Sequence, residues 1–221
     1  MKRMRLVLLA SGRGSHVVNL IEATRDGRIQ GEVAHVVVDR PDAPVIEKAR
    51  ALGVAVTLLE PFQPGARLSP GAEEQLAGII RVAAPDLIGL CGFMRLLSGP
   101  LIERAGVPIL NVHPSLLPSF RGLHAQRQAL EAGVRVTGAT IHYVDAGMDT
   151  GPILLQAAPP ILPDDTEDTL SARLLVLEHR LYVEAIRLLS AGAVRREGRR
   201  VTIEPAAATQ QSTLTAERGT A

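Results

Sequence analysis

Aromatic residues are scarce in this sequence of 221 residues: three phenylalanines and two tyrosines make up 2% of it, and tryptophan is absent. Proteins that bind single-stranded nucleic acids stack the bases on aromatic side chains, and this chain has little material for such a surface. An excess of one charge is lacking too, because 24 lysines and arginines oppose 23 acidic residues and leave a net charge of +1. The composition therefore predicts small-molecule partners and no nucleic acid.

Cysteines and long hydrophobic runs are also nearly missing. The single cysteine, Cys91, cannot form an internal disulfide, which fits a reducing compartment. The basic start of the chain leads into only five apolar residues, Leu6 to Ala10, a run too short for a signal-peptide core or a membrane span. The six histidines lack the spacing of a metal site. We therefore expect a cytoplasmic protein with no membrane segment and no metal.

Short apolar or β-branched runs alternate with amphipathic stretches along most of the chain. This alternation predicts an α/β fold with an open, mostly parallel twisted sheet, helices on both faces and one antiparallel strand pair near the C-terminal half. Strands are expected over residues 6–10, 33–38, 54–59, 87–91, 107–112, 134–144, 153–157 and, as an added edge, 201–203. Helices are expected over 17–23, 42–52, a stretch ending at 83, 124–132 and 165–190.

The length and the element order predict one domain over residues 1–205. Beyond Pro205 the chain is rich in Ala, Thr, Gln and Ser and has no hydrophobic period. Such a composition cannot bury enough apolar surface to fold, so residues 206–221 are predicted to form a disordered tail.

A glycine-containing loop, Ser11 to His16, joins the first expected strand to the first expected helix. Glycines let the backbone turn tightly, and the unpaired N–H groups of the following helix then favour a phosphate. A plain turn is one alternative. A dinucleotide-binding loop is another, since Asp39 ends the second strand where a ribose-binding acid would stand, although Val17 replaces the third glycine of that motif.

Asn111 and His113 end the fifth expected strand and, being two residues apart, point to the same face of it. The carboxyl ends of parallel strands line the ligand crevice of such sheets. An asparagine amide can donate to a developing oxyanion, and a histidine can move a proton near neutral pH. The pair predicts acyl-type transfer; the alternative is that both side chains merely satisfy backbone groups before Pro114.

The Gly-rich segment from Asp145 to Pro152 carries a further candidate, Asp149. A loop held between two paired strands can present one carboxylate rigidly. A carboxylate beside His113 would fix the tautomer of the imidazole and favour its charged form. A solvated turn aspartate is the alternative.

Three segments together resemble the phosphoribosylglycinamide formyltransferases of purine biosynthesis, which depend on 10-formyltetrahydrofolate. These segments are Gly92-Phe93-Met94-Arg95-Leu96-Leu97-Ser98, Asn111-Val112-His113-Pro114-Ser115-Leu116-Leu117-Pro118, and Thr137-Gly138-Ala139-Thr140-Ile141-His142-Tyr143-Val144 running on to Asp149. The resemblance covers roughly Arg5 to Pro205 and implies the Rossmann-like fold of that family, with formyl transfer to the amine of glycinamide ribonucleotide.

The resemblance also implies the roles of single residues, with the ribonucleotide phosphate in the N-terminal half and the folate in the C-terminal half. The implied catalytic trio is Asn111, His113 and Asp149. The implied ribonucleotide contacts are Gly14, Ser15, His16 and Glu178, and the implied folate contacts are Arg67, Met94, Arg95, Leu96, Leu97, Asn111 and Val144. His16 stands where the family usually has asparagine, and Ser69 is the gap-free alternative to Arg67.

Two other functions stay open from the sequence. A formyltetrahydrofolate deformylase shares the trio but gives the formyl group to water; the early first strand is expected to leave no room for the N-terminal regulatory domain of such enzymes. A non-catalytic nucleotide-binding module would need only the first loop and Asp39. Either a monomer or a homodimer is expected.

Overall fold

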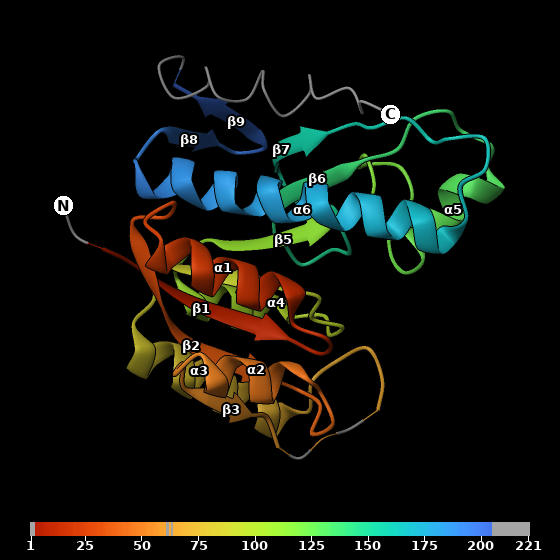
Figure 1. Cartoon of the computed structure of the whole chain (residues 1–221). Helices are drawn as coiled ribbons and strands as arrows, with labels where there is room; N and C mark the ends of the chain where they lie inside the picture. The colour runs from red at the N-terminus through yellow and green to blue at the C-terminus, as the bar shows by residue number, and fades with distance from the viewer. Residues whose placement is uncertain (1–2, 61, 63, 205–221) are drawn as a thin grey trace. The chain divides into compact units, whose positions relative to one another are not determined.

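Strands and helices alternate through the computed structural model, which describes residues 3–60, 62 and 64–204 (Figure 1). The elements are β1 (Met4–Ala10), α1 (Ser15–Arg25), β2 (Gly31–Val38), α2 (Val45–Ala51), β3 (Val56–Leu58), α3 (Pro70–Ala83), β4 (Leu87–Leu90), α4 (Gly99–Ala105), β5 (Ile109–His113), α5 (Ala125–Glu131), β6 (Ala139–Tyr143), β7 (Ile153–Ala157), α6 (Glu167–Ser190), β8 (Val194–Glu197) and β9 (Arg200–Ile203). This order confirms the predicted α/β class.

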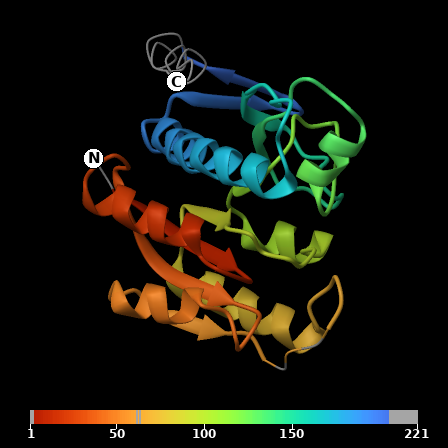
Figure 2. The same cartoon turned by 45° about the vertical axis from the view of Figure 1, so that its right-hand side comes forward.

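Seven strands of the described chain form one sheet in the order β3-β2-β1-β4-β5-β6-β7. Strand β1 pairs in parallel with β2 and β4, β2 pairs in parallel with β3, and β4 pairs in parallel with β5 (Figures 1 and 2). Strands β6 and β7 are antiparallel. The open, mostly parallel sheet with an antiparallel pair in the C-terminal half is therefore confirmed.

By Cα positions the chain divides into two compact units. The first comprises the described residues up to 111 together with 143–148, and the second comprises 112–142 and the described residues from 149 on. Helices α1 to α4 belong to the first unit, and α5, α6 and the hairpin of β8 and β9 belong to the second. The single domain over 1–205 stays a prediction, and the predicted tail at 206–221 lies outside the described residues.

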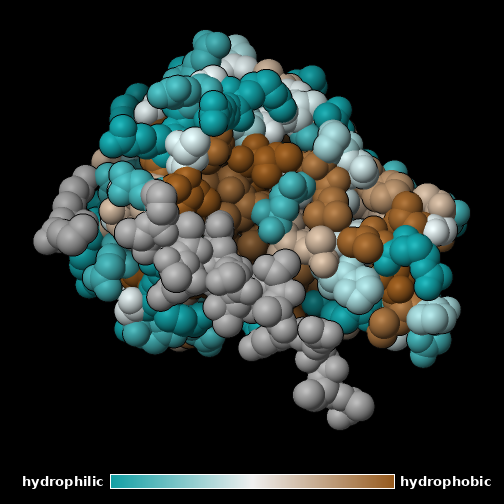
Figure 3. All heavy atoms as spheres, turned by 90° about the horizontal axis from the view of Figure 1, so that it is seen from above, coloured by the Kyte–Doolittle hydropathy of each residue, from teal (hydrophilic) through white to brown (hydrophobic). Residues whose placement is uncertain are grey.

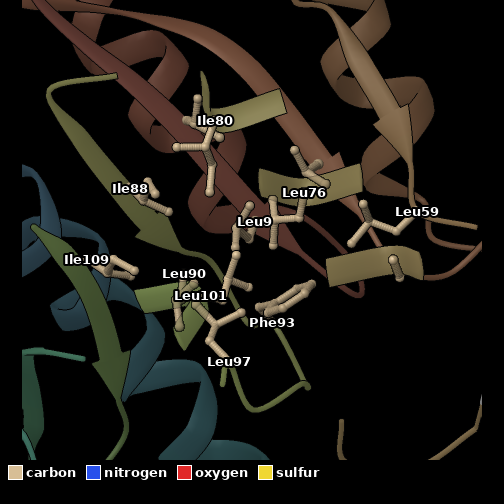
Figure 4. Packing of buried hydrophobic residues seen from close by; sticks show 13 residues of the cluster. Leu9, Leu59, Leu76, Ile80, Ile88, Leu90, Phe93, Leu97, Leu101 and Ile109 are labelled. Carbon is tan, nitrogen blue, oxygen red and sulfur yellow. The ribbon is translucent and has the colours of Figure 1, made fainter. Parts of the chain in front are cut away.

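Side chains from one face of the sheet and from α3 and α4 form a core in the first unit. Figure 4 shows Leu9 and Ile88 of the sheet beside Leu76 and Ile80 of α3. Leu6 and Leu8 alternate with the clustered Val7 and Leu9 along β1, and all four are fully buried. Burial on both faces explains why the first strand reads as an unbroken apolar run.

Three details differ from the sequence expectations, each for a local reason. Only Ala139–Tyr143 of the expected strand over 134–144 pairs as a strand; before it, Gly138 lies so close to Ala157 that an added Cβ would overlap the Ala157 carbonyl oxygen. Helix α4 is unanticipated; Ser98 caps it by accepting a hydrogen bond from the Leu101 N–H. The expected edge strand over 201–203 instead pairs with β8 in a separate two-stranded sheet.

Hydrophobic side chains gather on the face seen in Figure 3, with hydrophilic residues around them. Among the described residues of the second unit, Leu123, Val136, Leu162 and Val176 are large hydrophobic side chains exposed by more than two fifths. No helix within the described part of the chain is long and apolar enough to cross a membrane.

Whether the protein is a monomer or a homodimer stays a prediction.

Candidate active site

The loop between β1 and α1 requires glycine at position 14 for two independent reasons. Gly14 has a left-handed backbone with φ 76° directly before α1. A Cβ there would lie 2.6 Å from Val45 Cβ and 3.0 Å from Val45 Cα. The Val45 N–H donates to the Gly12 carbonyl at 3.2 Å, and Lys48 Nζ donates to the Arg13 carbonyl at 2.7 Å. Helix α2 thus holds this loop in place through Val45 and Lys48.

Helix α1 starts with Ser15 and His16, and the first turn carries no acidic residue. Gly14, as the N-cap, offers no side-chain hydrogen bond to the first N–H groups of the helix. Orphan N–H groups and the helix dipole together favour an anion at this end. The arrangement fits a phosphate group, as the sequence predicts.

Ser11 ties this loop to the segment after β4, a role that the sequence analysis missed. Its N–H donates to the Gly92 carbonyl at 3.2 Å, and its buried hydroxyl accepts from the Met94 N–H at 2.8 Å. A serine at the end of a strand is too common to signal such a contact. Ser11 therefore joins the predicted phosphate loop to the predicted folate segment through its backbone and its side chain.

The predicted folate segment leaves the carboxyl end of β4 and is paired with the loop before α3. The Leu96 N–H donates to the Ala66 carbonyl at 2.7 Å, and Leu96 forms an isolated parallel bridge with Arg67. Met94 is exposed, whereas Leu97 joins the hydrophobic core. Val144, half-buried against the same core, donates its N–H to the Ile109 carbonyl at 2.8 Å.

The two candidates for the folate contact in this segment, Arg67 and Ser69, lie in different environments. The Ser69 side chain is buried, and its hydroxyl caps α3 by accepting from the Ala72 N–H at 3.1 Å. Arg67 is exposed while its backbone is bridged to Leu96. Arg67 therefore has a fixed backbone and a side chain free to reach outward.

The Arg95 guanidinium is buried and forms an ion pair with Asp39. Nε donates to Asp39 Oδ2 at 2.5 Å, and both side chains are buried, with 7% and 2% of their surfaces exposed. Asp39 is therefore shielded from solvent and paired with a cation, so it is not available to bind a ribose hydroxyl. This contact removes the basis of the dinucleotide-binding alternative.

His113 ends β5 and is buried between two acceptors. Its Nε2 lies 2.8 Å from the Phe120 carbonyl oxygen, and its Nδ1 lies 3.4 Å from Asp149 Oδ2. With its hydrogen on Nε2 the ring donates to the Phe120 carbonyl, while Nδ1 faces the Asp149 carboxylate. The structure thus brings His113 and Asp149 together in the second unit across 36 positions of sequence. Asn111, in register with Leu90 of β4, is the last β5 residue of the first unit.

Asp149 also faces a second buried histidine, His142 of β6, which the sequence analysis did not assign. His142 Nε2 lies 3.6 Å from Asp149 Oδ1, and the Gly122 N–H donates to Oδ2 at 2.8 Å. Burial raises the pKa of Asp149, but the hydrogen bonds from His142 and Gly122 and the charge of His113 outweigh it and set the pKa below 3.8. Asp149 is consequently a carboxylate at neutral pH.

The turn after His113 is held by Thr140, a second residue that the sequence analysis passed over. Thr140 Oγ1 donates to the Ser115 carbonyl at 2.6 Å and accepts from the Leu117 N–H at 3.1 Å and from Gln156 Nε2 at 3.0 Å. The residue has no exposed surface. Its hydroxyl therefore satisfies both polar groups of a buried turn.

Replacing Thr140 with valine is expected to lower the free energy of unfolding by about 2 to 4 kcal/mol. The substitution hardly changes the volume but leaves the buried Leu117 N–H and Ser115 carbonyl without this hydrogen-bond partner. Urea unfolding measures the change. Thr202→Val, at an exposed position of β9, is the control and should stay within about 0.5 kcal/mol of the parent. A Thr140 variant as stable as that control would contradict the role of this hydroxyl.

Glu178 occupies a position on the buried side of α6, between Leu174 and Leu181. Only 7% of its surface is exposed, so the side chain is not a solvated one. A buried carboxylate in an apolar stripe costs free energy unless it has polar partners. Glu178 therefore needs polar partners at this position, and its role as a ribonucleotide contact stays a prediction.

No group of three or more His, Cys, Asp or Glu side chains in the described residues has the arrangement of a metal site. The predicted site residues fall into two sets. In the first unit the structure joins the predicted phosphate loop, the segment after β4 and Arg67; in the second it joins His113 and Asp149.

Comparison with known proteins gives a family match over most of the chain: a profile of the formyl transferase family matches residues 4–186. The chain is 40% identical over 187 residues to a phosphoribosylglycinamide formyltransferase of Bacillus subtilis, covering 84% of this chain and 94% of the relative. It is 42% identical over 193 residues to a trifunctional purine biosynthetic protein of Drosophila melanogaster, covering 86% of this chain but spanning only 14% of that protein.

Solved structures agree with the sequence comparison. A glycinamide ribonucleotide transformylase of Symbiobacterium toebii is 47% identical, with a TM-score of 0.84 over 91% of this chain and 94% of the other. A formyltetrahydrofolate deformylase of Pseudomonas syringae reaches the same TM-score of 0.84 over 92% of this chain and 66% of its own, at 20% identity, a likeness that concerns the fold alone.

Proposed function

The chain belongs to the formyl transferase family, and from this premise we propose that it transfers the formyl group of 10-formyltetrahydrofolate to the amine of glycinamide ribonucleotide. This activity is that of a phosphoribosylglycinamide formyltransferase in purine biosynthesis. The observation that carries the proposal is the buried pair of His113 and Asp149 at the end of β5. Small molecules are its partners, and a cytoplasmic location stays a prediction.

The reaction starts with attack of the neutral amine on the formyl carbon, which produces a tetrahedral oxyanion. The Asn111 amide and the protonated His113 imidazole stabilise this oxyanion as hydrogen-bond donors. Because Nε2 of His113 is held by the Phe120 carbonyl before substrate binds, this contact gives way to the formyl oxygen when Nε2 is the donor. A proton then passes from the new ammonium to the departing folate nitrogen.

Asp149 supports His113 through its charge and its fixed position. Its carboxylate is ionised at neutral pH, and Gly122 and His142 hold both oxygens. A fixed anion beside the ring stabilises the imidazolium without a cost of reorganisation during the reaction. In this mechanism Asp149 therefore orients the His113 ring and relays protons through water.

The two substrates take different parts of the chain. The phosphate of the ribonucleotide binds the N–H groups of Gly14, Ser15 and His16 at the start of α1. Folate contacts come from Arg67, the segment Met94–Leu97, Asn111 and Val144. Arg95 contributes its backbone to this segment, because its guanidinium is bound to Asp39.

Glu178 is assigned to the ribose hydroxyls, which carboxylates bind as hydrogen-bond acceptors. Replacing Glu178 with alanine is expected to lower kcat/KM for the ribonucleotide about 10-fold or more, through the loss of a charge-assisted hydrogen bond. The KM for the folate should change by less than about twofold. Steady-state kinetics with each substrate varied in turn measures both. An unchanged kcat/KM for the ribonucleotide would show that Glu178 is misplaced.

Absorbance change on mixing the protein with a 10-formylfolate and glycinamide ribonucleotide tests the proposed function. A transferase requires both compounds and produces formylated ribonucleotide. A deformylase releases the formyl group without the amine, and a nucleotide-binding module gives no change at all. Either of these two results would overturn the proposal.

A further inference from the structure

We propose that Asp39 is a positioning residue for the folate side of the site and that it acts through Arg95. The inference rests on the proposed function, because it concerns where the folate contacts lie. Asp39 and Arg95 come from different strand ends: Asp39 follows β2 directly, and Arg95 stands five positions after β4. Their contact joins two parts of the first unit that are 56 positions apart in sequence.

Three segments meet at the Arg95 guanidinium. Nε donates to Asp39 Oδ2 at 2.5 Å, and Nη1 donates to the Gly65 carbonyl. The guanidinium carbon lies 5.3 Å from the centroid of the Phe62 ring, within the range of a cation–π contact. The loop between β3 and α3 is therefore bound to Arg95 at two points, through a backbone carbonyl and through an aromatic face.

The same loop carries the predicted folate-contacting arginine. Two residues after the anchored Gly65, Arg67 bridges Leu96, and between them the Ala66 carbonyl accepts from the Leu96 N–H. These backbone contacts pair the loop with the folate segment one residue beyond Arg95. A shift of the guanidinium therefore moves Gly65 and, with it, the backbone from which the Arg67 side chain extends.

Asp39 is suited to fix the guanidinium because it has no competing role among the described residues. Only 2% of its surface is exposed, and its Oδ1 has no hydrogen-bond partner in the described part of the chain. A buried ion pair adds little net stability compared with an apolar pair, but it permits few alternative geometries. We infer that this pair serves to specify one position of the loop.

The test compares Asp39→Asn and the double variant Asp39→Leu/Arg95→Met with the parent. Asp39→Asn leaves the Arg95 cation buried without a counter-charge, so its loop should be released even though the site residues are intact. In the double variant both charges are gone and the core is apolar, which restores folding but provides no anchor for Gly65.

Two readouts are expected to change in both variants. The KM for 10-formyltetrahydrofolate should rise about 10-fold or more in both, and in Asp39→Asn kcat and the ribonucleotide KM should stay within about twofold of the parent. Trypsin should cut the bond after Arg67 about 10-fold faster, measured by mass spectrometry relative to the bond after Arg28, because cleavage reports local opening. Asp42→Asn is the control. Asp42 lies three positions after Asp39 and forms an exposed ion pair with Arg40, so removing its charge should change neither readout.

The outcomes separate this inference from the proposed function. A parent protein without transferase activity would overturn the proposed function, and the trypsin rates would still decide whether Asp39 holds the loop. An active parent and a double variant with parental folate KM would show that the ion pair contributes only to stability and would overturn the inference. Unchanged cleavage after Arg67 in both variants would overturn it as well.

Discussion

Asp149→Asn is expected to lower kcat about 100- to 1000-fold at neutral pH while the protein stays folded. The carboxylate is ionised at that pH, because its contacts with His142, Gly122 and His113 outweigh the effect of burial on its pKa. Asparagine removes the charge next to His113 at nearly constant shape, and its amide oxygen can still accept from the Gly122 N–H. Asparagine also tolerates the φ of 52° at this position.

A double-mutant cycle with His113→Asn tests whether the two side chains act as one unit. Each single variant should lose a similar factor in kcat, and the double variant should be little worse than either, because the effects of groups that act together are not additive. Asp145→Asn makes the same change of charge in the same loop and serves as the control, with kcat within about threefold of the parent. Strictly additive losses would show that His113 and Asp149 act independently.

The pKa of Asp149 also gives a pH signature. A carboxyl group whose pKa is lowered by folding stabilises the protein above its unfolded pKa, and the contribution disappears as pH falls through the folded pKa. The difference in free energy of unfolding between the parent and Asp149→Asn should therefore shrink once the pH drops below 3.8. A difference that stays constant down to pH 2 would contradict the assigned contacts.

Gly14→Ala is expected to raise the KM for the ribonucleotide about 10- to 100-fold and to leave the KM for the folate within about twofold. The added Cβ is disfavoured at φ 76° and would also lie 2.6 Å from Val45 Cβ, so the loop must move away from α2. The N–H groups proposed to bind the phosphate move with it. Steady-state kinetics with each substrate varied separately measures the effect.

The chain offers two matched comparisons for Gly14. Gly12→Ala changes the same loop where a Cβ would meet nothing within 4 Å, so its kinetics should remain near those of the parent. Val45→Ala added to Gly14→Ala should not rescue it, because Val45 Cα would still lie 3.0 Å from the new Cβ. Equal losses for both substrates in Gly14→Ala would contradict a phosphate role for this loop.

The sequence alone was sufficient where a structural requirement is local. The unbroken apolar run of β1 follows from burial on both faces, and Gly14 follows from a backbone conformation that other residues rarely adopt. The alternation of strand and helix determines the α/β class because parallel strands need a crossover between them. Asn111 and His113 could be placed at one strand end because side chains on a strand repeat every two residues.

Tertiary structure decided every contact between residues far apart in the sequence. The sequence predicted that Asp149 lies near His113, but only the structure gives the distance between the two side chains. Neither spacing nor composition indicated that His142 also approaches Asp149. Asp39 could be a ribose-binding acid by its position at a strand end, yet Arg95, 56 residues later, occupies it. The physical reason is the same in each case: a local pattern reports a residue's own backbone and burial, whereas hydrogen-bond and charge partners are chosen by the packing of the whole unit.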